Sequence, residues 1–466
     1  MSAQRGGPGG LPGFGPERYG GDSARQRLSL LFDEGSFVEL DGFARSELEP
    51  SGVVCGFGTA QGASLCAFAQ DGPMGRAHAD KILKLSDLAL KTGAPMIGIY
   101  DSRGLLLDEG IDALDACGEI LAKVNNLSGV VPQISVILGP CVGVAAMLAC
   151  SADFVVMEKE AEFYAVPPQY DAPEKAGSAD DAMAAGTVQL VASGSDSAVA
   201  AAKKLLSLLP SNNLSALPRS EFVTPADTAE LLREASHDLK SADVAAVAEA
   251  ILDADSALSL YDGFGTGVFA AFGTLGGSPC GLLATRGEAL SGDDCAKIAR
   301  LVSVWDSFQI PVVTLVNTPG MAAPTEAPYA SSLRDMAKLA HVYAEATAPK
   351  LAVITGRAYG AAYVALTSGA GADYTLAWPS AVISALPPRT AVAFQEGNRI
   401  TEDRTREALE REYVDKKAGP VLAAEQGHID DVIDPAATRE ALLALLSILG
   451  AKRVQRNPKK HGNIPF

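Results

Sequence analysis

The sequence predicts an α/β fold built by tandem duplication of one unit, because two sets of motifs recur at a nearly constant separation. Pro95–Gly104 (PMIGIYDSRG) and Pro311–Gly320 (PVVTLVNTPG) each join a proline, an apolar run, polar residues and a glycine, 216 residues apart (311 − 95). Such a run, bounded by turn residues, is typical of a buried parallel strand. The helix before each strand also repeats, with Lys81-Ile82 matching Lys297-Ile298.

A second set of motifs follows in each half and has the order strand, glycine turn, alanine-rich helix, aspartate, strand. The matched positions are Pro132 and Pro349, Gly143 and Gly360, Asp153 and Asp373, and the Pro-Pro pairs at 167–168 and 387–388. Strands that alternate with helices predict βαβ units and mainly parallel sheets.

The repeat and the composition together predict three segments. Residues 1–22 are rich in Gly and Pro and are expected to form a flexible tail, followed by domains at 23–217 and 218–466. The join lies in a stretch rich in Pro, Ser and Asn, LPSNNLSALPRSEFVTPAD. One amphipathic helix is expected after it, from Thr228 to about Asp253.

A formal net charge of −18 makes nucleic acid an improbable partner, since the chain repels phosphate backbones. The exception is the basic run Lys452–His461, which we expect to be a solvated tail. The first 22 residues lack the apolar core of a signal peptide, so a cytoplasmic location is expected. Prolines interrupt the apolar stretch Gly129–Cys150, which therefore predicts a strand, a turn and a helix rather than a membrane span.

The cysteines and histidines give no sign of a metal site. The chain has 7 Cys and 5 His, without a Cys-x-x-Cys pair and without histidines at ligand spacing. An odd number of irregularly spaced cysteines, several in apolar runs, is typical of buried reduced thiols in a cytoplasmic protein.

The two glycine turns are the candidate functional elements. In ILGPCVGVAAML and ITGRAYGAAYVA a strand runs through a glycine directly into a helix. The first turn of a helix leaves backbone N–H groups unpaired, and a small residue lets a carbonyl oxygen approach them. The pattern therefore predicts an oxyanion hole made by the backbone. Tight packing of helix on strand explains the same glycines, and the residues alone leave both interpretations open.

At these residues the chain resembles the carboxyltransferase β-subunit family of biotin-dependent acyl-CoA carboxylases and decarboxylases. That family includes the propionyl-CoA carboxylase β chain, transcarboxylase and the methylmalonyl-CoA decarboxylase α chain. The resemblance covers nearly the whole chain. Its stretches are GSFVELD (35–41), AHADKILKLSDLALKTGAP (77–95), GVVPQISVILGPC (129–141), LLSLLPSNNL (205–214), YAEATAPK (343–350), AYGAAY (358–363) and KKHGNIPF (459–466).

The resemblance implies two crotonase-like domains in tandem (the ClpP/crotonase superhelix fold), often assembled as a hexamer built from dimers. It implies acyl-CoA on the N-terminal domain of one subunit, facing biotin on the C-terminal domain of another. Biotin would arrive on a separate carrier protein, since this chain has no Ala-Met-Lys-Met biotin site. The further partners implied are a biotin carboxylase or the subunits of a membrane decarboxylase pump.

The resemblance also implies site residues. Carboxyl transfer passes through a thioester enolate and a ureido anion, which need one oxyanion hole each. The family's first turn holds the thioester oxygen and its second turn the ureido oxygen. The matching catalytic positions are Gly143 and Val144 in the first turn, and Ala361 and Ala362 in the second. The candidate substrate-binding residues are Arg103, Gly104, Gly360 and Val364. Arg103 and Gly104 lie in a loop that departs from the family's Asp-Ser-Gly-Gly-Ala-Arg.

Several of these positions depart from the family pattern. The family's Ala-Gly-Gly-Ala is Val142-Gly143-Val144-Ala145 here, and an Asp used in substrate choice is replaced by Val364. A β-branched residue keeps its N–H but cannot readily take a positive φ. The Arg103 guanidinium suits a carboxylate or phosphate, and equally a surface ion pair.

Two other functions are open on the sequence alone. One is a non-catalytic subunit that completes a hetero-oligomer with an intact paralogue, because departures from the family fall in both turns. The other is a crotonase-type hydratase or isomerase, for which Glu109 is the nearest carboxylate, although a solvated helix start explains Glu109 as well.

Overall fold

The computed structural model of this chain describes residues 22–44, 52–166, 175–239, 241–323, 332–369, 371–401 and 403–465. Residue contacts divide the chain into two compact units, Met1–Pro218 and Arg219–Phe466. Of the 1–22 segment only Asp22 is described, as the first residue of a helix, and Pro167-Pro168 lies outside the described residues.

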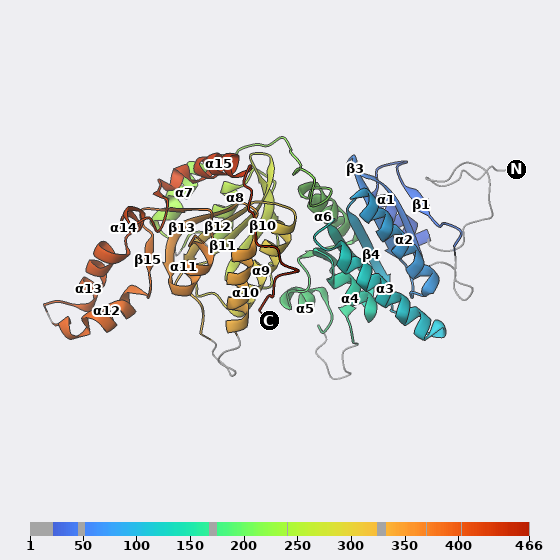
Figure 1. Cartoon of the computed structure of the whole chain (residues 1–466), viewed down its shortest axis with the longest axis horizontal. Coiled ribbons are helices and arrows are strands. Elements are labelled where there is room, and N and C mark those ends of the chain that lie inside the picture. The colour runs from blue at the N-terminus through green and yellow to red at the C-terminus, as the bar shows by residue number, and fades with distance from the viewer. Residues whose placement is uncertain are drawn as a thin grey trace. The chain divides into compact units, whose positions relative to one another are not determined.

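The first unit contains an eight-stranded sheet in the order β1-β2-β3-β4-β5-β6-β8, with β7 paired to β5. Figure 1 shows α2 and α3 lying along this sheet, and their apolar faces join one buried cluster with strands β2 to β6. The elements are α1 (Asp22–Leu31), β1 (Val38–Leu40), β2 (Val53–Ala60), β3 (Ala63–Gln70), α2 (Arg76–Thr92), β4 (Met96–Ser102), η1 (Leu107–Glu109), α3 (Ile111–Leu127), β5 (Gln133–Val142), α4 (Val144–Cys150), β6 (Phe154–Glu158), β7 (Phe163–Tyr164), α5 (Ala179–Ala184), β8 (Leu190–Ala192) and α6 (Ser195–Leu208).

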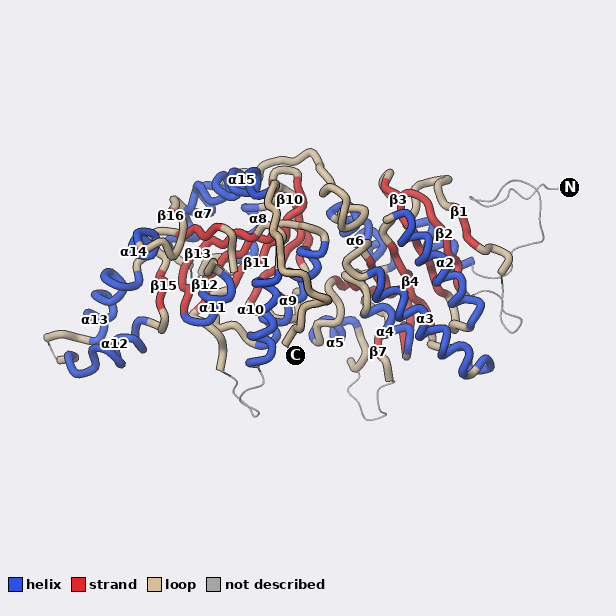
Figure 2. Tube along the Cα trace, viewed as in Figure 1, coloured by secondary structure: helices blue, strands red, loops and turns tan. Residues whose placement is uncertain are grey.

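The second unit repeats this plan, with the strand order β16-β14-β13-β12-β11-β10-β9 and β15 paired to β13. Figure 2 shows its strands in red, and the helices α12 and α13 extending from them as an arm. The elements are α7 (Thr228–His237), α8 (Val244–Ile251), β9 (Leu258–Ser259), β10 (Val268–Leu275), β11 (Ser278–Thr285), α9 (Gly292–Ser307), β12 (Val312–Thr318), α10 (Leu333–Glu345), β13 (Lys350–Tyr359), α11 (Gly360–Leu366), β14 (Tyr374–Ala377), β15 (Val382–Ser384), α12 (Pro388–Glu396), η2 (Gly397–Arg399), α13 (Arg406–Tyr413), η3 (Val414–Ala418), α14 (Pro420–Glu425), β16 (Asp431–Val432), η4 (Pro435–Ala437) and α15 (Thr438–Leu449).

Each sheet is mixed rather than wholly parallel, because it opens with an antiparallel hairpin before the parallel strands begin. The β2–β3 turn is Gln61-Gly62, with φ of 51° and 79°, and the β10–β11 turn is Gly276-Gly277, with φ of 64° and 73°. Two positive φ values in a two-residue loop match the twist of the flanking strands. The Asp33 carboxylate accepts the N–H groups of the first turn, at 2.8 and 2.9 Å.

The repeat seen in the sequence extends to single hydrogen bonds. The buried ammonium of Lys81 donates to the Val53 carbonyl at 3.2 Å, and that of Lys297 to the Val268 carbonyl at 2.7 Å, so each lysine ties a helix to the first residue of a strand. The matched aspartates Asp153 and Asp373 each accept the N–H of the first residue of the long central strand, β5 or β13, at 2.8 Å.

The single helix expected from Thr228 to Asp253 is in fact two helices, α7 and α8. The second begins because the Asp243 side chain accepts the N–H groups of Ala245 and Ala246, which is the local bonding that favours aspartate at a helix start. By contrast, Gly129–Cys150 forms β5, a turn and α4, as predicted. Among the described residues no helix has the length and apolar character needed to cross a bilayer.

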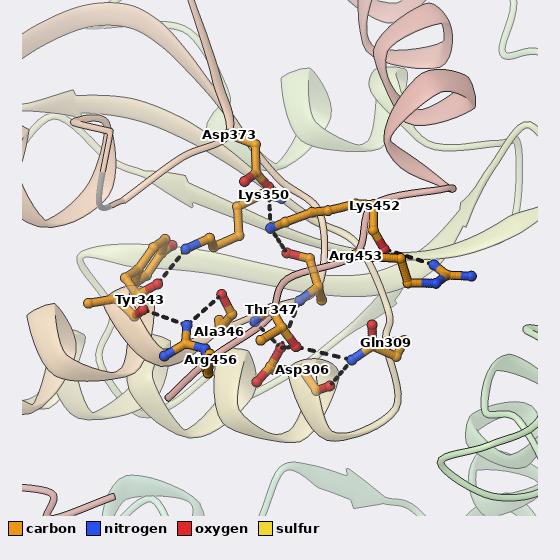
Figure 3. Close-up of polar contacts among 12 residues, drawn as sticks. Asp306, Gln309, Tyr343, Ala346, Thr347, Lys350, Asp373, Lys452, Arg453 and Arg456 are labelled. Atoms are coloured by element: carbon orange, nitrogen blue, oxygen red, sulfur yellow. Dashed lines mark hydrogen bonds and ion pairs between the residues drawn. The ribbon is translucent and has the colours of Figure 1, made fainter. Parts of the chain in front are cut away.

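The basic C-terminal run is bound to the second unit, so the expected solvated tail is wrong. Lys452 donates to the Asp373 carboxylate at 2.8 Å and to the Ala348 carbonyl at 3.0 Å (Figure 3). Arg456 donates to the carbonyl of Ala344 at 2.6 Å, and Lys459 pairs with Glu345. Cations suit this place, because the last carbonyls of helix α10 have no partners within the helix.

The core of the second unit supplies a test of packing. Trp305 is 0% exposed, and a methyl group on Gly281 would overlap its ring. We expect Gly281→Ala to lower the free energy of unfolding by about 1–3 kcal/mol, because the buried ring cannot move aside. Both tryptophans of the chain, Trp305 and Trp378, lie in this unit, so urea denaturation followed by tryptophan fluorescence reports on it.

The matched control is Gly397→Ala. Gly397 has φ of −55° and open space around its Cα hydrogens, so alanine fits there without strain. A change within about 0.5 kcal/mol is expected for it. Equal stabilities of the two variants would contradict the packing argument.

Candidate active site

The first glycine turn lies where β5 passes into α4. Gly143 has φ of 65° and ψ of −131°, a conformation open to glycine and strained for residues with a side chain. Its own N–H donates to the Tyr164 carbonyl on β7 at 3.0 Å. Val144 and Ala145 are the first two residues of α4, so the helix itself gives their N–H groups no acceptor. Gly143 and Val144 are partly exposed, which lets a ligand reach this turn.

The loop that carries Arg103 and Gly104 adjoins this turn. Gly104 has φ of 103°, and a side chain on it would come within 3.8 Å of the Val142 carbonyl at the end of β5. The Gly104 carbonyl accepts the Met74 N–H at 2.8 Å and the Ser102 hydroxyl at 3.2 Å, which fixes the loop. The structure therefore brings Gly104 together with the Gly143 turn, as the predicted site requires.

Arg103 itself is exposed and lies within electrostatic reach of Tyr164. Burial and the neighbouring Glu162 raise the pKa of Tyr164, and the Arg103 guanidinium opposes this rise. Within the described segments Arg103 has no ion-pair partner. No described carboxylate therefore neutralises this guanidinium next to the first turn. A guanidinium in this state can bind a carboxylate or phosphate.

The second unit repeats the loop and the turn. Gly320 has φ of 121°, and its carbonyl accepts the Leu290 N–H at 2.9 Å and the Thr318 hydroxyl at 3.0 Å, which matches the bonds of Gly104. Gly360 has φ of 54° and begins α11. A side chain on Gly360 would come within 3.2 Å of the Ala385 carbonyl, a tight contact that adds to the strain of a positive φ at this position.

The predicted residues after Gly360 differ in their access to solvent. Ala361 is exposed and Ala362 is buried, while the Val364 side chain is 59% exposed. As the early residues of α11, Ala361 and Ala362 have N–H groups that the helix leaves without an acceptor. Of these two, Ala361 lies where a ligand can approach.

A pocket of about 560 Å³ lies beside the second turn, within the range typical of small-molecule sites. Two predicted residues, Gly360 and Val364, line it. The other lining residues are Tyr363, Ile383, Ser384, Ala385, Tyr413, Lys417, Gly419, Leu422, Ala423, Gln426 and His428. The Tyr363 hydroxyl donates to the His428 carbonyl at 2.8 Å, and the Tyr413 and Ser384 hydroxyls are hydrogen bonded at 2.9 Å, which braces two walls.

Sequence reasoning missed the side of this pocket that α13, η3 and α14 form. Tyr413 and Lys417 belong to the helical arm of the second unit, to which the repeat assigns no counterpart in the first (Figure 1). The signal that could have found them is the segment EYVDKKAGP, where aromatic, basic and glycine residues interrupt a helical pattern.

Glu109 has a capping role. Its carboxylate accepts the Arg76 N–H at 2.5 Å, at the start of α2, and a side chain on Gly75 would come within 2.6 Å of it. Glu109 therefore caps the start of α2 and is not simply part of a solvated helix start. A carboxylate bonded in this way gives no support to the hydratase or isomerase alternative.

Known proteins are similar to this chain over nearly its whole length, including both glycine turns. The carboxyl transferase domain pattern matches residues 17–464. The chain is 35% identical to the methylmalonyl-CoA decarboxylase subunit alpha of Veillonella parvula, over 95% of this chain and 93% of that one. It is also 35% identical to the propionyl-CoA carboxylase beta chain of Saccharopolyspora erythraea, over 95% and 90%.

Among solved structures, the chain is similar to the transcarboxylase 12S hexamer assembly with hydrolysed methylmalonyl-coenzyme A bound. The TM-score is 0.89 at 35% identity, over 95% of this chain and 92% of that one. This likeness, together with the two mixed eight-stranded sheets, confirms the predicted fold class, a tandem duplication of a crotonase-like α/β domain.

Proposed function

Because the chain belongs to the carboxyl transferase family of biotin-dependent acyl-CoA carboxylases, we propose that it moves a carboxyl group between biotin and a short-chain acyl-CoA. The acyl-CoA is of the propionyl-CoA or methylmalonyl-CoA type, as the names of its relatives suggest. Biotin is carried by a separate carrier protein. The direction of transfer follows from the other subunits present, either a biotin carboxylase or membrane decarboxylase pump subunits.

The observation that carries the proposal is the duplicated turn, with a positive-φ glycine before a helix start in each unit. Acyl-CoA carboxyl transfer needs two places where negative oxygen is stabilised, and backbone N–H groups fixed in advance provide such places. We assign the first turn to the thioester oxygen and the second to the ureido oxygen. Arg103 and Gly104 border the first turn and Val364 the second, so they serve binding of the two substrates.

Within the first turn the donor is Val144 rather than Gly143. The Gly143 N–H already binds the Tyr164 carbonyl, whereas the helix leaves that of Val144 without an acceptor. Gly143 contributes by its backbone conformation, which starts the helix at the right residue. In the second turn we assign the donor to the exposed Ala361, with Ala362 as the buried residue behind it.

The pocket beside the second turn fits a biotin ring system in size, and its walls combine aliphatic and aromatic side chains with Gly360 at one end. When bound, biotin supplies the transferable carboxyl group and a basic ureido nitrogen. Val364 and Leu422 are among the apolar side chains of the wall that would contact the ring.

We further propose that the chain works as a homo-oligomer, with a hexamer as the first expectation because transcarboxylase 12S forms one. A hetero-oligomer in which this chain is a non-catalytic partner of an intact paralogue is the second candidate. The observation that favours it is the engaged Gly143 N–H beside Val144, which leaves fewer backbone donors at the first turn.

The test is biotin-dependent decarboxylation of methylmalonyl-CoA and malonyl-CoA by the purified oligomer, sized first by light scattering. We expect turnover with a biotinylated carrier and none without biotin. Gly143→Ala should lower kcat/KM by about 10²-fold or more, since alanine forces the turn out of its conformation.

The matched control is Gly62→Ala in the β2–β3 hairpin. Gly62 also has a positive φ, at 79°, and open space around it. Alanine therefore strains the backbone of the hairpin there without affecting the Gly143 turn. It should keep full activity. Absence of turnover with any ester, in an oligomer of the right size, would overturn the enzyme proposal and favour the partner subunit.

A further inference from the structure

The pocket beside the Gly360 turn has one fixed charge in its wall. Of its thirteen lining residues Lys417 alone carries a permanently charged side chain, and the pocket contains no carboxylate. An ammonium at the edge of an apolar pocket interacts more strongly with an anion than it does in bulk water. The wall thus has the composition of a site for a ligand that is part apolar and part anionic.

The charge of Lys417 is held in place by uncharged groups. Its ammonium donates to the side-chain oxygen of Gln395 at 3.1 Å and lies 5.8 Å from the centre of the Tyr413 ring. Within the described residues it has no acidic partner, so no described carboxylate neutralises its charge. A cation on an aromatic face keeps its attraction for an anion on its open side.

The neighbouring Lys416, on the same π-helical turn, differs from Lys417 because a carboxylate neutralises its charge. Lys416 forms an ion pair with Glu412 at 2.9 Å, and Glu412 forms a second ion pair with Arg404 at 2.6 Å. These two cations hold the pKa of Glu412 at about 2, so it stays ionised and committed to them. Glu412 is thereby unavailable to Lys417, and among the described residues no ion pair joins Lys417 to Asp415, the carboxylate nearest to it in sequence. Of the two lysines, Lys417 alone lines the pocket.

The chain as a whole repels anions, with a net charge of −18. A pocket that binds an anion in such a protein needs a local cation at its rim. Lys417 lies on η3, a five-residue π-helical turn between α13 and α14. That turn places residues 413 and 417 together on the pocket side, while 416 is directed to the outer surface.

We propose that Lys417 makes this pocket selective for a ligand that bears a carboxylate, so that it distinguishes the carboxylated form of its ligand from the uncharged form. The proposal rests on the proposed function for the identity of the ligand, and on the pocket itself for the carboxylate. Two sources supply this chemistry, namely a carboxyl group borne on the ureido ring of biotin and the free carboxylate of a malonyl-type acyl group.

The experiment measures direct binding to the intact oligomer by titration calorimetry, with pairs of stable probes in which one member bears a carboxylate and the other is uncharged. One pair is biotinamide and N-carboxymethyl biotinamide, in which the ureido ring carries the carboxylate. The other pair is methylmalonate and its diamide. We expect the carboxylate of one pair to bind about 10-fold tighter than its neutral partner, the gain of one exposed charge-assisted hydrogen bond.

Lys417→Met should remove this preference and leave the neutral probe unaffected, since the side chain keeps its length and loses its charge. Lys417→Arg should restore the preference. Lys416→Met, one residue away, is the matched control and should behave as wild type. Thermal unfolding of each variant confirms that the arm is folded.

The outcomes separate this proposal from the proposed function. If the charged and neutral probes bind equally to wild type, if no probe binds, or if Lys416→Met loses as much as Lys417→Met, the proposal is overturned. Selective binding through Lys417 in a protein without turnover would leave it standing while the enzyme proposal fails. The probe pair that shows the preference identifies the source of the carboxylate.

Discussion

Replacing Arg439 by Met should lower the free energy of unfolding of the Arg219–Phe466 unit by about 3–5 kcal/mol, the usual result of breaking a buried ion pair on one side. Arg439 and Asp253 are 5% and 2% exposed, and the guanidinium meets the carboxylate at 2.6 Å. Arg439 also donates to the Ile251 carbonyl. Methionine fills much of the space but leaves the Asp253 carboxylate buried without its cation.

The position of this ion pair explains why its loss should lower the free energy of unfolding so much. Asp253 also accepts the N–H groups of Gly276 and Gly277, at 3.0 and 2.8 Å, so it holds the turn of the β10–β11 hairpin. Arg439 lies on α15, far along the chain. One buried cluster therefore joins residues near the beginning and the end of the unit.

Tryptophan fluorescence during urea denaturation measures this effect, because Trp305 and Trp378 both lie in this unit. The control is Arg233→Met, which breaks the Arg233–Asp434 pair. That pair is 61% and 57% exposed with 3.6 Å between its charged atoms, so a change below about 0.5 kcal/mol is expected. If both variants lose the same stability, the buried pair contributes no more to the free energy of unfolding than an exposed one, and the prediction is wrong.

The effect should also depend on pH in one direction. Burial acts to raise the pKa of Asp253, but Arg439 and the N–H groups of Gly277 and Gly276 hold it below the ordinary value of 3.8. A carboxyl whose pKa is lowered by folding stabilises the protein above its unfolded pKa, and this contribution disappears as pH falls through the folded pKa. The stability difference between wild type and Arg439→Met should therefore be constant near neutral pH. It should shrink as the pH falls through the range in which Asp253 takes up a proton, which begins at higher pH in the variant because its carboxylate has lost the Arg439 cation.

Much of the fold could be predicted from the sequence because the duplication repeats chemistry as well as pattern. Lys81 and Lys297 match in the sequence, and each binds the first carbonyl of an equivalent strand. The long elements were predictable, since a buried strand between helices leaves a clear apolar run. The β2–β3 hairpin was not, because the positive φ of Gln61 leaves no mark in a hydrophobic pattern, whereas the Gly276-Gly277 pair between two apolar runs is itself a hairpin signal.

The candidate site was predictable to the same extent. The turns at Gly143 and Gly360 follow from small residues between strand and helix, and the structure gives both glycines positive φ. Their partners were not predictable, because Tyr164 lies on a later strand and Ala385 directly follows one, and only the fold determines the register of those strands. The arm residue Lys417 has no repeat partner, so the duplication that revealed the rest gave no information about it.

Val144→Pro should lower kcat/KM for carboxyl transfer by about 10²–10³-fold, because proline removes the one backbone N–H that we assign to the first oxyanion hole. Val144 is the first residue of α4, a position where proline is well tolerated, since its N–H has no partner in the helix. The substitution therefore deletes the donor while it keeps the helix start.

Val144→Gly is the matched variant, because it retains the N–H and removes only the side chain. It should keep at least wild-type activity, and gain some if the valine restricts approach of the thioester. Binding of the acyl-CoA in the ground state should change little in either variant, so kcat falls with kcat/KM in Val144→Pro while KM stays near the wild-type value.

The comparison of these two variants distinguishes a backbone donor from a side-chain effect. Equal loss of activity in Val144→Pro and Val144→Gly would assign the role to the valine side chain, and full activity in both would place the oxyanion donor outside this turn. Loss in the proline variant alone requires the N–H itself. Since the N–H of Gly143 is bonded to the Tyr164 carbonyl, the same result would show that the helix start, through Val144, supplies the donor.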